Sequence, residues 1–305
     1  MMARQSFEEL YAGVPTEQKA QLLDFRERHR YKEIKANRKT WRYIATGRGE
    51  EALVFLPGAF LPADMWFYQV DALADRYRIL VTDAYALQGL FDLDQVSWLL
   101  EEMLESEGFD AATFVGLSAG GGLVQYLLQE RPKTVANAIL SHCGPIIYDE
   151  KGARQGRRLL SLARFLPISI LHRIVVRQTS GQPPADSGWV AFHSAYYQEQ
   201  AARLSKEMFV SFMKLGLDTR RDFAFKPKVV ATWPGRMLLL TSEDDTSSYP
   251  KLEILQERYP QASTHVFAAG GHHTYLFYPE AYTEAVVRFL TIEGTGAGNR
   301  GPVGT

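Results

Sequence analysis

The chain has 305 residues, of which 46% are hydrophobic and 23% charged, a composition typical of a globular protein that needs no disulfides or metals to fold. Its 34 basic and 35 acidic residues give a formal net charge of -1, which argues against a nucleic-acid or polyanion partner. No apolar run approaches the roughly 20 residues that span a bilayer, so we expect no membrane span.

The first part of the chain predicts a helical extension over residues 1–30, with its helix at 16–30. A hairpin follows, with strands near 31–36 and 40–46 and a turn at Asn37. The hairpin marks the start of the main fold.

From there, short apolar segments alternate with segments of helical spacing. The apolar segments are predicted strands at 52–56, 78–82, 112–116, 136–141, 236–241 and 263–267. The helical segments are 64–76, 92–107, 119–131, 250–259 and 279–292. Continuous apolar strands that alternate with helices predict an α/β fold with a mostly parallel central sheet, covered by helices on both faces.

The alternation is interrupted once, by residues 145–230, which read as several helices with breaks at Pro167 and at Gly181–Pro184. Such an insertion can lie over the carboxyl ends of the strands, where open α/β sheets bind ligands. We therefore predict a helical cap at 145–230 on a core of 31–144 and 231–292. The Gly-rich residues 293–305 predict a disordered tail.

The strongest motif is G-L-S-A-G at 116–120, between a predicted strand and a predicted helix. This is the context of a nucleophile elbow, in which a sharp turn presents a serine at the edge of the sheet. Gly116 and Gly120 keep that turn free of clashes, and the helix N-terminus favours developing negative charge. Ser118 is therefore the candidate nucleophile.

These residues resemble the α/β-hydrolase superfamily from about residue 40 to 292. The resemblance implies an acid and then a histidine, each in a loop after a late strand. S-E-D-D-T at 242–246 and A-A-G-G-H-H at 268–273 supply both. The resemblance implies an acid three residues after the small residue that ends the strand, which from Ser242 gives Asp245, with Asp244 as the fallback. Gly271, His272 and Pro279 also resemble the G-H-(x)6-P pattern common in this fold, which favours His272 over His273 as the base.

The resemblance also implies two backbone donors that stabilise an oxyanion. One is the N–H of Ala119, directly after the nucleophile. The other comes from L-P-G-A-F at 56–60, where Ala59 is the expected donor and Phe60 the fallback.

A second resemblance, to the maspardin-like group, lies in 56–70 (L-P-G-A-F-L-P-A-D-M-W-F-Y-Q-V), 116–123, 259–262 and 270–276, with the cap segment L-P-I-S-I-L. It implies a non-catalytic binding or adaptor protein with an incomplete catalytic set. This chain departs from that pattern because it carries histidine at the expected base position.

Other polar and aromatic residues have two interpretations. His142 and Cys143 follow a strand and could line a pocket, although packing is the favoured interpretation. Four aromatic residues of the predicted cap could shape an apolar acyl pocket or form its packing face. They are Trp189, Phe192, Tyr196 and Tyr197. His193 has no partner that the sequence identifies.

The sequence as a whole predicts a serine hydrolase that cleaves a carboxylic ester, with lactones, amides or C–C bonds as alternatives on the same residues. The expected substrate is a small or medium apolar acyl compound, and the chemistry needs no cofactor or metal. One cysteine and the absence of an apolar core in the first ten residues favour a cytoplasmic protein.

Overall fold

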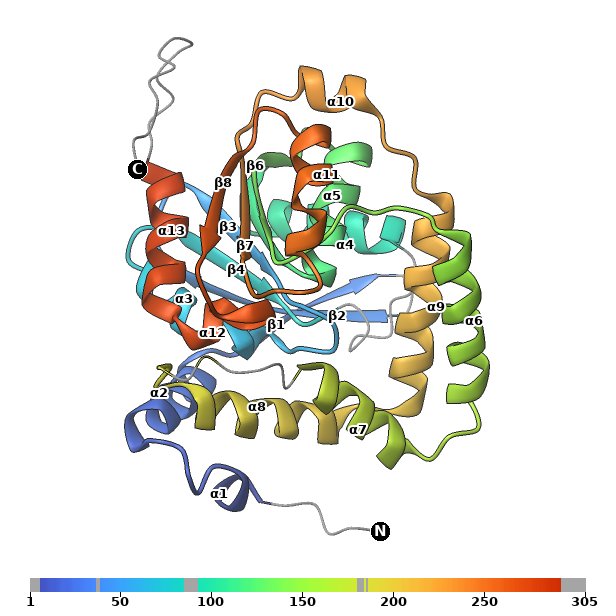
Figure 1. Ribbon diagram of the computed structural model, residues 1–305. Helices are drawn as coiled ribbons and strands as arrows, with labels where there is room; N and C mark the ends of the chain where they lie inside the picture. The colour runs from blue at the N-terminus through green and yellow to red at the C-terminus, as the bar shows by residue number, and fades with distance from the viewer. Residues whose placement is uncertain (1–5, 37–38, 85–92, 180–183, 185, 292–305) are drawn as a thin grey trace.

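The computed structural model describes residues 6–36, 39–84, 93–179, 184 and 186–291, and its centre is one eight-stranded sheet. The strand order is β1-β2-β4-β3-β5-β6-β7-β8 (Figure 1). The strands are β1 (Tyr31–Ala36), β2 (Lys39–Gly47), β3 (Ala52–Leu56), β4 (Arg78–Thr82), β5 (Ala112–Leu117), β6 (Val135–Ser141), β7 (Met237–Ser242) and β8 (Ser263–Phe267).

Strand direction follows the sequence prediction. β2 pairs antiparallel with both β1 and β4, and every other neighbouring pair is parallel. The predicted hairpin is confirmed as β1 and β2, while its expected turn at Asn37 lies outside the described residues. The parallel pairs bring the carboxyl ends of β3, β5, β6, β7 and β8 to one edge of the sheet.

Helices cover the sheet on both faces, as buried strands require. Along β3, Leu53 and Phe55 pack in one core cluster and Val54 and Leu56 in another, because successive side chains point to opposite faces. The first cluster includes residues of α2 (Thr16–Arg28), α3 (Phe67–Leu73) and α13 (Pro279–Thr291). The second includes residues of α4 (Leu93–Ser106), α5 (Ala119–Glu130) and α11 (Leu252–Arg258).

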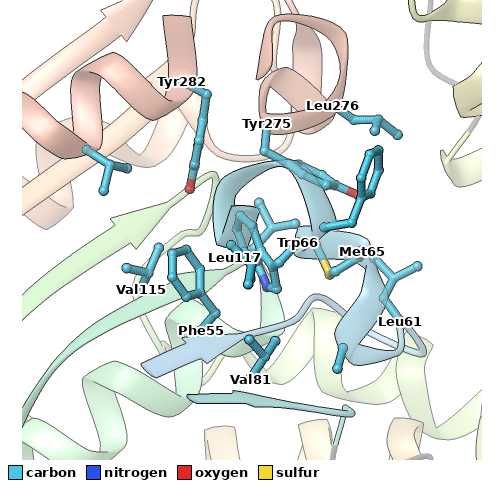
Figure 2. Packing of buried hydrophobic residues seen from close by; sticks show 14 of the residues in the cluster. Phe55, Leu61, Met65, Trp66, Val81, Val115, Leu117, Tyr275, Leu276 and Tyr282 are labelled. Atoms are coloured by element: carbon cyan, nitrogen blue, oxygen red, sulfur yellow. The ribbon is translucent and has the colours of Figure 1, made fainter. Parts of the chain in front are cut away.

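Trp66 is at the centre of the first cluster, at the end of the 3₁₀ helix η1 (Ala63–Trp66) (Figure 2). Its ring centroid is 5.1 Å from that of Phe55 and 5.2 Å from that of Tyr275, in α12 (Thr274–Phe277). This packing fixes the loop after β3 against the segment that follows β8, and the candidate site lies between those two segments.

In the described part of the chain between β6 and β7 there are five helices, which we call the insertion helices. They are α6 (Glu150–Ala163), α7 (Ile168–Thr179), α8 (Val190–Arg203), α9 (Lys206–Asp222) and α10 (Pro227–Thr232). In Figure 1, α7 and α8 run across the lower end of the sheet. α7 begins directly after the predicted break at Pro167; of the second predicted break, only Pro184 is described, and the predicted tail lies outside the described residues.

The N-terminal segment forms α2 and a short helix that the sequence prediction missed, α1 (Phe7–Leu10). Ion pairs join this segment to the insertion helices. Arg26 contacts Asp64 at 2.6 Å and Glu199 of α8 at 3.1 Å, and the Tyr11 hydroxyl donates to the same Glu199 at 2.7 Å. The N-terminal helices therefore hold α8 against the core.

Two further 3₁₀ helices, η2 (Tyr249–Lys251) and η3 (Gly271–His273), complete the described elements. Within the described ranges, every helix falls short of the length and apolar character that crossing a membrane requires.

Candidate active site

Ser118 occupies the turn between β5 and α5, with φ 52° and ψ -109°. A positive φ is uncommon for a residue with a side chain, and it persists only where the surroundings enforce it. Here the Ser118 N–H donates to the Ser141 carbonyl at 2.9 Å, and the Ser118 carbonyl accepts from Gly122 at 3.1 Å. The elbow is therefore held by β6 on one side and by α5 on the other.

The two glycines of the motif make this turn possible. A Cβ on Gly120 would lie 2.3 Å from the carbonyl oxygen of Leu56, and a Cβ on Gly116 would lie 2.5 Å from the carbonyl oxygen of Gly120. Both distances are shorter than van der Waals contact. Side chains are therefore excluded where α5 passes the ends of β3 and β5.

His272 lies in η3, after β8, and contacts a carboxylate that follows β7. Its Nδ1 is 2.9 Å from Oδ2 of Asp245. The His272 side chain is 30% exposed, whereas that of Asp245 is 1% exposed. An imidazole held in this way has Nδ1 bonded to the acid, and its Nε2 can exchange protons with a neighbouring group.

Asp245 accepts several hydrogen bonds besides that of His272. The Ser247 N–H and hydroxyl donate to Oδ1 at 2.9 and 2.6 Å, and the Ser248 hydroxyl donates to Oδ2. Burial opposes ionisation, but these bonds and the His272 imidazole favour the carboxylate and hold the pKa of Asp245 well below its usual range. Asp245 is consequently a fixed anion beside His272. The sequence prediction did not include Ser247 or Ser248, although both lie within three residues of Asp245.

The neighbouring carboxylate has a different position. Oδ1 of Asp244 accepts from the Gly271 N–H at 2.8 Å, and its Oδ2 accepts from the Gly270 N–H at 3.2 Å. Asp244 thus holds the backbone that precedes His272, and Asp245 holds its ring.

The predicted oxyanion donors lie in two adjacent segments. Ala119 is the first residue of α5, so no carbonyl of that helix can accept its N–H. Ala59 lies in the loop after β3, where a Cβ on Gly58 would be 3.5 Å from the Leu117 side chain. The loop therefore packs against the residue before Ser118. The fallback residue Phe60 has φ 61°, and its ring centroid is 4.5 Å from that of Phe212 in α9.

His273 contacts the insertion helices. Its Nδ1 is 2.8 Å from Nε2 of His193 in α8, and both side chains are buried. Burial lowers the pKa of His193 to about 3 and that of His273 well below its usual value. The sequence prediction could not find this partner for His193, because the two residues are 80 positions apart.

His142 and Cys143 are both buried at the end of β6. His142 Nε2 lies 3.0 Å from the Thr274 hydroxyl, and its ring centroid is 6.1 Å from that of His272. Burial lowers the pKa of His142 to about 3 and raises that of Cys143 to about 12. Cys143 packs beside Gly121, and a neutral His142 packs behind the His272 loop.

The aromatic residues of α8 pack rather than line an open pocket. Phe192, Tyr196 and Tyr197 are at most 5% exposed and belong to the first core cluster, and Trp189 packs against it. The Tyr196 hydroxyl donates to Asp64 at 2.6 Å. This face of α8 is therefore occupied by the core.

A cavity of about 630 Å³ opens beside the loop after β3. Its wall includes Phe60 and Pro62 from that loop, residues of α2, β1 and β2, and residues of α8 and α9. Within the described part of the chain, no group of three or more metal-ligating side chains comes together.

The buried histidines predict a pH-dependent stability. Unfolded histidines bind protons below about pH 6.5, whereas His142 and His193 stay neutral in the folded protein until about pH 3. The unfolded state therefore binds more protons in this range, and the free energy of unfolding falls as the pH drops. We expect a loss of about 1.4 kcal/mol per pH unit for each such histidine. Urea unfolding at pH 7, 6 and 5 measures it.

The matched variant for this experiment is His193→Asn, which removes one titrating group and keeps a polar side chain. Its stability should depend less steeply on pH than that of the wild type. Asp245 does not interfere, because a carboxylate with a lowered pKa loses its contribution only as the pH falls below about 3.9. Equal slopes for the two proteins would contradict the prediction.

Comparison with known proteins agrees with this fold. A hydrolase from Pseudomonas aeruginosa PA01 has a TM-score of 0.71 at 18% identity, over 86% of this chain and 98% of that one. An esterase from Exiguobacterium antarcticum has a TM-score of 0.67 at 18% identity, over 85% of this chain and 98% of that one. These likenesses show a shared fold.

In sequence, the chain is 30% identical over 106 residues to the dihydrolipoyllysine-residue acetyltransferase component of the acetoin cleaving system of Cupriavidus necator. That match spans 32% of this chain and only 28% of the relative. The model of the alpha/beta hydrolase family matches residues 53–288, which include the elbow, both aspartates and both histidines. With most of its length matched, and with the sheet and elbow described above, the chain belongs to the alpha/beta hydrolase family.

Proposed function

We propose that the protein is a serine hydrolase that cleaves a carboxylic ester through Ser118, His272 and Asp245. The observation that carries the proposal is the 2.9 Å contact between His272 Nδ1 and the buried Asp245 carboxylate. It occurs at the sheet edge where Ser118 is held in its strained turn. A histidine oriented by an acid, at the same sheet edge as a serine in an elbow, is the arrangement expected to activate a hydroxyl for acyl transfer.

In the proposed reaction, His272 Nε2 takes the proton of the Ser118 hydroxyl while its oxygen attacks the ester carbonyl. Asp245 stays ionised and stabilises the imidazolium that forms. The N–H groups of Ala119 and Ala59 donate to the oxyanion, with Phe60 as the alternative second donor. His272 returns the proton to the leaving alcohol. It then takes a proton from a water molecule that attacks the acyl carbonyl, and gives this proton to the Ser118 oxygen as the acid product leaves. These residues complete the reaction with no cofactor or metal.

An ester is the favoured bond because the proposed oxyanion donors and base meet the requirements of acyl transfer to water. Lactones, amides and C–C bonds could be cleaved by the same residues, since the fold does not choose among them. The maspardin-like resemblance suggests a different class, a binding protein without turnover. The presence of His272 favours the enzyme.

A fluorophosphonate probe, with intact mass as the readout, tests the proposal. We expect one adduct on the wild type and none on Ser118→Ala or His272→Ala. Ser161→Ala is the control, because Ser161 lies on α6 and bonds only within that helix. The proposal is contradicted if the folded wild type forms no adduct and hydrolyses no 4-nitrophenyl ester. That result would favour the binding protein.

A further inference from the structure

The cavity of about 630 Å³ beside the loop after β3 is rich in guanidinium groups. Four arginines line it, Arg26, Arg30, Arg42 and Arg203, and two carboxylates do so, Asp64 and Asp83. A third carboxylate, Glu199, bonds to Arg26 and Arg203. Among the described side chains, four guanidinium groups therefore meet three carboxylates, a cationic excess in a cavity of ligand size.

The excess is located most clearly at Arg30 and Arg203. Arg30 has no ion pair among the described residues, and the Arg203 side chain is 44% exposed although it contacts Glu199. A guanidinium group has five N–H donors, so one contact with Glu199 leaves donors on Arg203 for a ligand. A carboxylate can accept two parallel bonds from such a group.

Gln200 provides a separate indication of a missing acceptor. This residue lines the cavity and is 5% exposed, yet its side-chain Nε2 has no hydrogen-bond partner within the described structure. Its Oε1 accepts from Arg203 at 3.4 Å, which leaves the amide donor unsatisfied. A buried donor without a partner is costly. Neighbouring atoms cover Nε2, so an acceptor-only ligand would satisfy this donor once the Gln200 amide turns toward the cavity.

The remaining wall has the polar side chains of His29 and Tyr31 and an apolar part. The apolar part includes Phe25, Ile44 and Met208, together with Phe60 of the loop proposed to bind the oxyanion. In the strand order, β2 is three strands from β5, which is about 14 Å at the usual strand spacing. A short carbon chain could therefore lie along the apolar wall, with its carbonyl toward Ser118 and an acidic group among the arginines.

We propose that this cavity binds a carboxylate at the far end of the substrate, so that the enzyme prefers esters whose acyl chain ends in a free acid. The inference rests on the proposed serine-hydrolase function. It replaces the purely apolar substrate expected from the sequence with one that is apolar in the middle and anionic at its end.

Matched 4-nitrophenyl esters test the preference. The pairs are the mono-ester of adipic acid against the hexanoate, and the mono-ester of suberic acid against the octanoate. We expect wild type to have at least a tenfold higher kcat/KM for the acidic member. Arg30→Gln/Arg203→Gln should lose about tenfold on the acidic esters, mainly through KM, and change little on the neutral ones. Arg48→Gln/Arg221→Gln, whose side chains are 82% and 60% exposed and do not line the cavity, is the charge-matched control.

A binding measurement separates this inference from the proposed function. Calorimetry with adipate on the Ser118→Ala protein should show binding that Arg30→Gln/Arg203→Gln weakens by about tenfold. If the probe labels Ser118 but adipate does not bind and neutral esters are preferred, the carboxylate site is wrong and the hydrolase stands. If adipate binds without labelling of Ser118, the site stands and the hydrolase is wrong. Tighter binding of inorganic phosphate than of adipate would also overturn the carboxylate assignment.

Discussion

Asp245→Asn should lower kcat for ester hydrolysis by about 10⁴-fold, the loss seen when the orienting acid of a serine triad becomes an amide. The asparagine NH₂ cannot accept the Nδ1–H of His272, so the imidazole would turn or adopt the other tautomer. The reaction would lose its oriented base as well as the charge that stabilises the imidazolium. Steady-state assays with a 4-nitrophenyl ester measure the activity. Urea unfolding of the same variant checks that it is folded.

Asp244→Asn is the matched control, because it makes the same chemical change one residue earlier. Its side chain contacts the Gly270 and Gly271 N–H groups and not the His272 ring. The remaining amide oxygen can still accept one of those bonds, so we expect a loss of less than tenfold. Equal losses in the two variants, or the larger loss in Asp244→Asn, would reverse the proposed roles.

Gly120→Ala should destabilise the fold by about 3 kcal/mol, the upper part of the range for overpacked interiors. The new methyl group would lie 2.3 Å from the carbonyl oxygen of Leu56. That atom belongs to the backbone of β3 and cannot move aside without shifting the adjacent loop. Urea unfolding should therefore show a lower midpoint, and the displaced loop should also reduce ester hydrolysis.

Gly122→Ala provides the comparison within the same helix. No atom lies within 4 Å of the Cβ it would add, so the substitution meets open space. Alanine is favoured over glycine inside a helix by about 0.5–1 kcal/mol, so this variant should be slightly more stable than the wild type. Destabilisation of both variants by the same amount would show that the close approach at Gly120 is not the cause.

The core of the fold was predictable because its signals are local. The predicted strands at 52–56, 78–82 and 263–267 coincide with β3, β4 and β8, since each is a short run bounded by turn residues. The helix α1 was missed, because four residues are too few for a periodic pattern. The sequence does contain a capping box, formed by Ser6 and Glu9. A capping box indicates the start of a helix when an apolar run follows it, and no long apolar run follows this one.

The candidate site was predictable in chain order but not in contact detail. The sequence predicts that Asp244 and Asp245 lie in the loop after the same strand. The structure shows that Asp245 is the one that contacts His272. The contact between His193 and His273 joins segments far apart in sequence, and no local pattern encodes such a pairing. The excess of arginines in the cavity also arises from segments distant in sequence, α2, β2 and α8, so composition alone could not show it.

The position of the insertion helices has a consequence for engineering. They leave the sheet after β6 and return at β7, and these two strands are neighbours. Ser118, Asp245 and His272 all lie outside that stretch, so another enzyme's insertion could be grafted between residues 144 and 231 while these three side chains keep their own supports. The graft must carry a buried acceptor or donor opposite His273, and partners for Arg26 and Asp64 in place of Glu199 and Tyr196. Without the group opposite His273, the imidazole next to the proposed base would be left with an unmet hydrogen bond, and the transplanted segment would dock poorly.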